Sequence, residues 1–235
     1  IRDRSDNSSS SEFSLVFKTV REQAKFLADG QISSQELVTA HLNQIERVNP
    51  SVNAIVTLVA DSALDQAKAA DESRIAGIEA GPFHGMPVLI KDLQDTKGIL
   101  TTQGSPIYKD HIPKSDALIV DRLKKAGAIV IGKSNTPEFG AGSQTFNSVF
   151  GATCNPYDVT KTCGGSSGGA GVALATGMVS IATGSDLGGS LRNPAAWSNV
   201  VGIRPTPGRV PSVGVDLGWS NLSVSYTHLR AHETR

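Results

Sequence analysis

Apolar positions recur at helical spacing over the first part of the chain. From Phe13 to Ala28 they predict a helix, and Gly30 is placed to end it. Ser33 and Glu36 have the spacing of a capping box, and an apolar face continues from there to about Val48. The chain is therefore expected to begin with two helices joined by a short turn.

Short apolar runs alternate with helical patterns in the rest of the chain. The runs predict buried strands at 87–90, 128–131 and 179–182. Further helices are predicted at 60–73, at 115–126 with Ser115 as its cap, at 170–177 and from about Ser190. Strands separated by helices favour a layered α/β domain.

Composition excludes several classes of function. Lys plus Arg and Asp plus Glu are both 22, so no basic excess is available for nucleic acid. No apolar run approaches the ~18 residues of a membrane span. Cys154 and Cys163 fit no zinc spacing, and we interpret them as reduced thiols, which favours the cytoplasm. The sequence starts at Ile1 rather than at a methionine, so a signal peptide upstream of Ile1 remains an alternative.

Glycine is abundant, with 24 residues, and many of them lie between 164 and 189 among serines. A flexible linker is one interpretation, but this segment lies between strongly patterned helices and strands. The segment from Gly127 to Ser134 satisfies the P-loop pattern, yet its four middle residues are apolar and mostly β-branched, which predicts a strand instead.

Two G-x-S-x-G patterns, centred on Ser166 and Ser167, match the nucleophile elbow of α/β-hydrolases. That elbow needs an apolar strand before the serine, and a histidine after it. The preceding residues are polar, and the only later histidines are His228 and His232, near the end of the chain. We therefore do not favour an α/β-hydrolase.

A third interpretation accounts for more of the sequence. An apolar strand ends at Lys91, a Gly/Ser cluster holds Ser166, and a second cluster 24 residues later holds Ser190. Together these motifs resemble the amidase signature family. The resemblance extends over about residues 13–222 and includes 85–92, 116–117, 126–128, 132–135, 138–139, 155–158, 163–170, 184–194 and 202–208.

The resemblance implies a catalytic triad of Lys91, Ser166 and Ser190. Ser190 would attack the amide carbonyl, and Ser166 would pass its proton to Lys91. Lysine can act as the base only when neutral, so its pKa must fall by several units from ~10.4, and burial after an apolar strand would lower it. No cofactor and no metal are implied, and the substrate is a small amide.

The resemblance also assigns supporting roles. The backbone N–H groups of Leu187, Gly188, Gly189 and Ser190 are expected to form the oxyanion hole. Gly165 is implied to precede Ser166 through a cis peptide bond, and Ser167 to support the triad by hydrogen bonding. Asp186 and Arg192 flank the oxyanion loop and are expected to pair, which would hold its shape.

The sequence departs from the common family pattern at two positions. Cys163 replaces a frequent proline, and Leu187 replaces a threonine that is typical of the A subunits of tRNA amidotransferases. The absence of this threonine, together with the residues at 195–197 and 204–207, favours a stand-alone amidase. The glutaminase component of an aminoacyl-tRNA amidotransferase is an alternative, and a non-catalytic remnant or binding protein is another. A homodimer is left open.

Three regions are expected along the chain. Residues 1–11 form a disordered polar tail, and residues 12–222 form the N-terminal part of an amidase domain. This domain is an α/β/α sandwich with a mixed central sheet, incomplete in this fragment and expected to have little activity alone. Residues 223–235 are expected to be a non-native tail that packs poorly, because 224–234 match a translated sequencing adapter.

Overall fold

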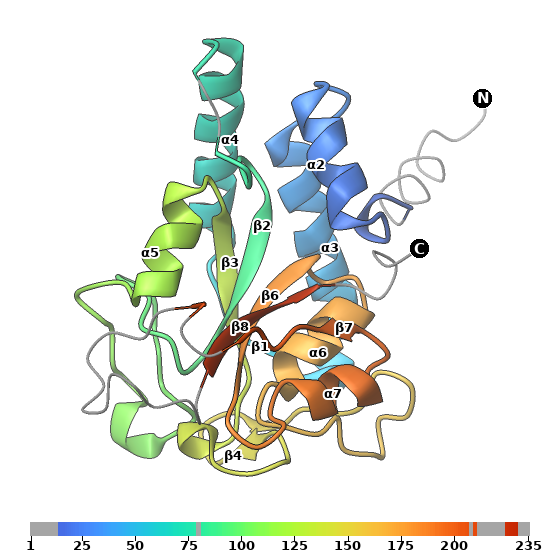
Figure 1. Ribbon diagram of the computed structural model, residues 1–235, viewed down its shortest axis with the longest axis vertical. Coiled ribbons are helices and arrows are strands. Elements are labelled where there is room, and N and C mark those ends of the chain that lie inside the picture. Colours follow the sequence, from blue (N-terminus) through green and yellow to red (C-terminus); the bar gives the residue numbers. More distant parts are fainter. Residues whose placement is uncertain (1–13, 79–80, 207–208, 211–223, 230–235) are drawn as a thin grey trace.

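The computed structural model describes residues 14–78, 81–206, 209–210 and, for the backbone alone, 224–229. Figure 1 shows helices on both sides of one sheet. The longer helices are α2 (Val20–Ala28), α3 (Ser34–Val52), α4 (Ala60–Ile75), α5 (Leu118–Lys125), α6 (Gly168–Ala175) and α7 (Arg192–Trp197), with 3-10 turns η1 (Pro106–Tyr108) and η2 (Glu138–Gly140). The predicted polar tail at 1–11 lies outside the described residues.

The central sheet has six strands in the order β1-β3-β2-β6-β8-β7. They are β1 (Ile55–Leu58), β2 (Pro87–Lys91), β3 (Ile129–Ser134), β6 (Ile181–Asp186), β7 (Val201–Gly202) and β8 (Val224–Leu229), and a separate pair is formed by β4 (Phe146–Asn147) and β5 (Gly151–Ala152). β2 is parallel to both β3 and β6, whereas the outer pairings are antiparallel. The sheet is therefore mixed, as expected.

Two apolar clusters fill the space on the two faces of the sheet. One packs α3, α4 and α6 against Leu89, Ile131 and Ala182. The other packs α2 and α5 against Val88 and Ile90. Because successive residues of β2 face opposite sides, its continuous apolar run is buried on both faces. The α/β/α layering predicted from the sequence is confirmed.

The helix starts differ from two predictions. Residues 14–16 are helical, as the pattern from Phe13 predicts, but the helix is interrupted at 17–19, and α2 begins at Val20 because Thr19 and Glu22 form a capping box that starts a new helix there. The helix expected from Ser115 begins at Leu118, and Ser115 does not cap it. The Ala117 N–H instead donates to the Asp95 carbonyl, which holds this segment in an extended connection.

Other predicted boundaries are close to those observed. The capping box of Ser33 and Glu36 starts α3, and Gly30 follows α2 with a positive φ of 67°. The strand predicted at 179–182 begins two residues later, at Ile181, and runs on to Asp186. The short strand β1 is not predicted by the sequence pattern, because its four residues lie between two long helical patterns.

The segment 224–229 is described for its backbone alone, so the expectation that it packs poorly stays a prediction. Its backbone forms β8, which pairs with β6 and with β7. β6 otherwise presents an unpaired edge, and such an edge pairs readily with a segment of strand-forming residues. The predicted adapter origin of residues 223–235 stays a prediction.

Candidate active site

Lys91 ends β2 inside the protein, with no exposed surface. Its amine nitrogen lies 2.7 Å from Ser166 Oγ, 2.9 Å from Ser167 Oγ and 2.9 Å from Ser185 Oγ. Three hydroxyl groups match the number of hydrogen bonds that an amine can form. The contact expected between Lys91 and Ser166 is present, and Ser167 hydrogen-bonds to the same amine, in line with its expected supporting role.

Burial has a large electrostatic effect on Lys91. The low-dielectric interior disfavours the ammonium form and lowers the pKa of Lys91 from 10.5 to about 7, although the Asp186 carboxylate opposes this decrease. At neutral pH a substantial fraction of the amine is therefore unprotonated. An unprotonated amine 2.7 Å from a hydroxyl can accept its proton.

Ser166 and Ser167 are held at the start of α6. The peptide bond between Gly165 and Ser166 is cis, as the resemblance implied. A side chain at 165 would place its Cβ 2.8 Å from the backbone of Gln144, so only glycine fits there. At Gly169 a Cβ would lie 2.5 Å from the Asn135 nitrogen. The glycines let α6 approach the sheet closely and bring both serines to Lys91.

Ser190 lies in the loop between β6 and α7 and is half-buried. Its carbonyl oxygen accepts a hydrogen bond from the Ser167 N–H at 2.9 Å, which fixes this loop against the start of α6. Within the described part of the chain, the Ser190 hydroxyl makes no hydrogen bond to Ser166. The structure thus brings Lys91 and Ser166 into contact and places Ser190 beside Ser167.

The predicted oxyanion loop follows β6 and needs one correction. The Gly189 N–H donates to Asp186 Oδ1 at 2.9 Å, so it does not point toward a substrate oxyanion. The reason is a tight turn in which the carboxylate accepts the N–H three residues later. Among the described residues, the N–H groups of Leu187, Gly188 and Ser190 donate to no other group.

Asp186 holds the shape of this loop. Arg192 binds its carboxylate through Nε and Nη2, both at 3.0 Å, as expected, and the Leu191 N–H also donates to it. Burial alone would raise the pKa of Asp186, but the Arg192 hydrogen bonds and the backbone N–H donors outweigh it and hold the pKa well below its usual range. Asp186 is therefore ionised and anchors both ends of the loop.

Sequence reasoning misses two members of the site. Ser185 provides the third hydroxyl group at Lys91, and its place directly before Asp186 is the available signal. Arg204 donates to Asp186 Oδ1 at 2.9 Å. The sequence identifies Arg204 only as part of a motif, because its distance of 18 residues from Asp186 gives no sign of this contact.

The alternative motifs do not form the structures they would need. The P-loop lysine, Lys133, is part of the buried strand β3 rather than a loop before a helix. Cys163 and Cys154 are free, and burial raises the pKa of the Cys163 thiol to about 12, so it is not a nucleophile. No group of three potential metal ligands occurs among the described residues. No helix of the described ranges is long and apolar enough to span a bilayer.

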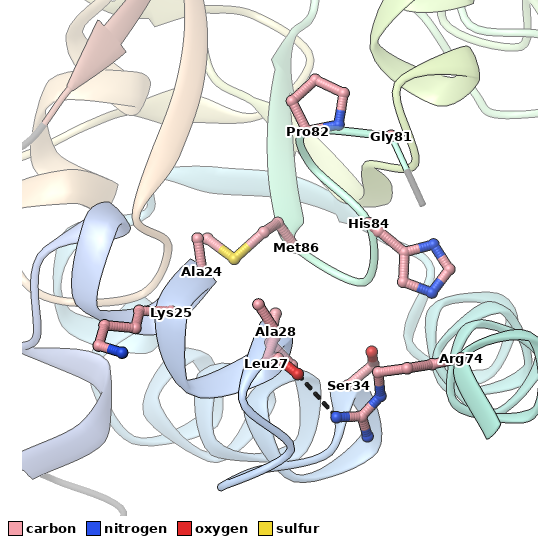
Figure 2. A pocket seen from close by; sticks show the side chains of 10 residues that line it. All are labelled: Ala24, Lys25, Leu27, Ala28, Ser34, Arg74, Gly81, Pro82, His84 and Met86. Carbon is pink, nitrogen blue, oxygen red and sulfur yellow. Dashed lines mark hydrogen bonds between the residues drawn. The ribbon is translucent and has the colours of Figure 1, made fainter. Parts of the chain in front are cut away.

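A cavity of about 560 Å³ lies at the other end of β2, where the strand begins (Figure 2). Two of its polar side chains are engaged within the protein: Arg74 donates to the Leu27 carbonyl at 2.7 Å, and the His84 ring contacts the Ala70 carbonyl at 2.9 Å. None of the predicted site residues contributes to its lining, which is formed by Ala24, Lys25, Leu27, Ala28, Ser34, Arg74, Gly81, Pro82, His84 and Met86.

Comparison with known proteins supports one family. The sequence profile of the Amidase family matches residues 36–228. Indoleacetamide hydrolase of Bradyrhizobium diazoefficiens is 50% identical over 189 residues, which are 80% of this chain and 36% of that protein. The A subunit of the glutamyl-tRNA(Gln) amidotransferase of Heliobacterium modesticaldum is 43% identical over 201 residues, 86% of this chain and 41% of that protein.

A solved structure of a bacterial aryl acylamidase of the amidase signature family superposes with a TM-score of 0.86 and 32% identity. The match covers 91% of this chain and 45% of that one. The chain thus spans about two fifths of the length of the curated relatives it matches. The order of the motifs, the fold and the profile match agree, and the chain belongs to the amidase signature family.

Proposed function

We propose that the protein hydrolyses carbon–nitrogen amide bonds through a serine acyl-enzyme, with Ser190 as the nucleophile. One observation supports the proposal above all others. A fully buried lysine, whose pKa is lowered to about 7, lies 2.7 Å from the Ser166 hydroxyl. Burying a lysine without a carboxylate in contact is costly, and a base that must be neutral at physiological pH gives a reason for it.

The proposed proton path runs from Ser190 through Ser166 to Lys91. Ser190 attacks the carbonyl carbon as its proton passes to Ser166 Oγ, and Ser166 releases its own proton to Lys91. The tetrahedral intermediate then expels the amine, which takes the proton back along the same path. Water repeats the sequence on the acyl-enzyme and releases the acid. Ser167 and Ser185 would hold the Lys91 amine in place.

The developing oxyanion would be bound by backbone N–H groups of Leu187, Gly188 and Ser190. These N–H groups are the remaining donors of the loop, because the Gly189 N–H already donates to Asp186. Removing one such donor from an oxyanion hole typically slows a reaction ~10²–10³-fold. Asp186 and its two arginines would contribute by fixing the loop rather than by touching the substrate.

For the substrate, we infer a simple aryl or alkyl amide. The 50% identity to a protein named indoleacetamide hydrolase supports an arylacetamide. We further propose a cytoplasmic location, which the two free cysteines support. The glutaminase function of a tRNA amidotransferase is a second candidate, since the corresponding protein of Heliobacterium modesticaldum is 43% identical. Leu187, where those proteins typically have threonine, favours the stand-alone amidase.

Ammonia release by the complete gene product tests the proposal. Indole-3-acetamide, phenylacetamide and glutamine would be compared, with Ser190→Ala as the inactive control. We expect turnover of the arylacetamides and little turnover of glutamine. A preference for glutamine would favour the amidotransferase function instead. Absence of ammonia from all three substrates, together with no cleavage of a chromogenic anilide, would contradict the proposed amidase.

A further inference from the structure

The structure buries a second lysine, Lys133 on β3, which has no part in the proposed reaction. It has no exposed surface, and its amine lies 2.5 Å from the Gln94 carbonyl oxygen, 2.8 Å from Thr96 Oγ1 and 3.1 Å from Thr101 Oγ1. All three acceptors belong to the segment that follows β2. Lys133 therefore ties both ends of this segment to the sheet.

The surroundings of Lys133 are charged but not in direct ionic contact with it. Burial lowers the pKa of Lys133 to about 8, while Asp92, Asp95 and Asp116 favour its charged form and Lys124 on α5 disfavours it. Keeping an amine in this position costs free energy that a methionine of similar length would not. Its three hydrogen bonds to the segment 94–101 indicate that the amine holds this segment in place.

That segment is directly connected to Lys91 through Gln94. The Gln94 N–H donates to the Lys91 carbonyl at 3.0 Å. The Gln94 side-chain oxygen accepts from Thr183 Oγ1 at 2.5 Å, and Thr183 Oγ1 accepts from the Lys91 N–H at 2.9 Å. Both backbone polar groups of Lys91 are thus fixed by a bridge that consists of Gln94 and Thr183.

The strand register keeps the two lysines from competing for the same partners. Lys133 is paired with Ile90, and Lys91 with Ser134, after a bulge between Val88 and Leu89. Because successive residues of a strand point to opposite faces, the two amines leave adjacent strands in opposite directions. Lys133 can hold the bridge from one side while Lys91 reaches the serines on the other.

We propose that Lys133 is a positioning residue that holds Lys91 within reach of Ser166 through the Gln94–Thr183 bridge. Its effect on turnover rests on the amidase function proposed above, whereas its effect on the geometry of Lys91 does not. Misplacing a catalytic group by about 1 Å can cost ~10² in rate, so the contribution is measurable.

Lys133→Met in the complete gene product tests the proposal. We expect kcat for a chromogenic anilide to fall ~10- to 100-fold while KM changes less than ~3-fold. The pH at which activity rises should also move above about 7, because a displaced Lys91 regains solvent and its pKa returns toward 10.5. A loss of stability with unchanged kcat and pH profile would overturn the proposal.

Thr183→Val removes the hydroxyl group of the Gln94–Thr183 bridge and is combined with Lys133→Met in a double-mutant cycle. If Lys133 acts through the bridge, the double variant should lose little more activity than the worse single variant, whereas additive losses would contradict this route. Should Lys133→Met fail to fold, Thr96→Val combined with Thr101→Val removes two of the three acceptors and is subject to the same criteria.

A crystal structure of Lys133→Met gives a readout that needs no turnover. We expect Lys91 Nζ to move out of hydrogen-bonding reach of Ser166 Oγ, which lies at 2.7 Å in the parent protein. An unchanged separation would overturn the proposal even if activity fell. A parent protein that hydrolyses no amide would instead contradict the proposed function, while the displacement of Lys91 could still be measured.

Discussion

Replacing Lys91 with methionine should stabilise the folded protein while abolishing its activity. Methionine has a similar length and no charge, so it fits the buried site without the cost of keeping an amine there. It also leaves the hydroxyl groups of Ser166, Ser167 and Ser185 without their common partner. The loss of these hydrogen bonds does not depend on pH. The pH dependence of the stability change therefore measures the cost of burying the amine alone.

The magnitude follows from the pKa of Lys91, which is about 7 in the folded state and 10.5 as the reference value. Each pKa unit corresponds to ~1.4 kcal/mol, so below pH 7 the buried ammonium costs the folded state roughly 5 kcal/mol. Between pH 7 and 10.5 the unfolded state binds more protons, so wild-type stability rises with pH and the cost falls to roughly 2 kcal/mol at pH 9. Methionine removes this dependence.

Urea unfolding of the complete gene product at pH 6 and at pH 9 measures the difference. The stability gain of Lys91→Met should be roughly 3 kcal/mol larger at pH 6 than at pH 9. Lys68→Met, at an exposed position of α4, is the matched control and should change stability by less than ~0.5 kcal/mol. An equal gain at both pH values would refute the argument that burial keeps Lys91 neutral.

Three further predictions concern the site and its supports. Ser190→Ala and Lys91→Ala should each lower kcat by at least ~10³-fold, and the double variant should lose little more; additive losses in anilide assays would show that the residues do not act as one unit. Gly169→Ala should destabilise the protein by more than ~2 kcal/mol, because its Cβ would lie 2.5 Å from the Asn135 nitrogen, whereas Gly188→Ala, with nothing within 4 Å, should unfold at nearly the parent urea concentration. Asp186→Asn should lower kcat ~10²-fold, because Arg192 and Arg204 lose the charge that fixes the loop; unchanged kcat would exclude a role for this anchor.

The layered architecture could be predicted because its strands and helices carry strong local patterns. The run at 87–90 and the alanine-rich segment at 60–73 each identify an element without tertiary information. The start of α5 could not be predicted in this way, because the Asp95 carbonyl, far away in sequence, holds Ala117 in an extended connection. The pairing of β8 is likewise missed, since it depends on the unpaired edge of β6.

The candidate site could be predicted as a set of residues but not as a network. An apolar strand ending at Lys91 indicates a buried amine, and Lys91 has no exposed surface in the structure, so burial lowers its pKa. The hydrogen bond from the Gly189 N–H to Asp186 depends on how the loop turns. The hydrogen bond from Arg204 to Asp186 depends on the chain returning past this loop. Such contacts are set by tertiary geometry, so spacing in the sequence does not reveal them.

The most direct test of the proposed mechanism is to locate the nucleophile by covalent labelling. The complete gene product would be treated with an aryl phosphonate, and the modified peptide identified by mass spectrometry over a range of pH. We predict a single adduct on Ser190, formed at a rate that rises as the pH passes about 7 and Lys91 becomes neutral. An adduct on Ser166 or Ser167, or a labelling rate that does not depend on pH, would contradict the mechanism.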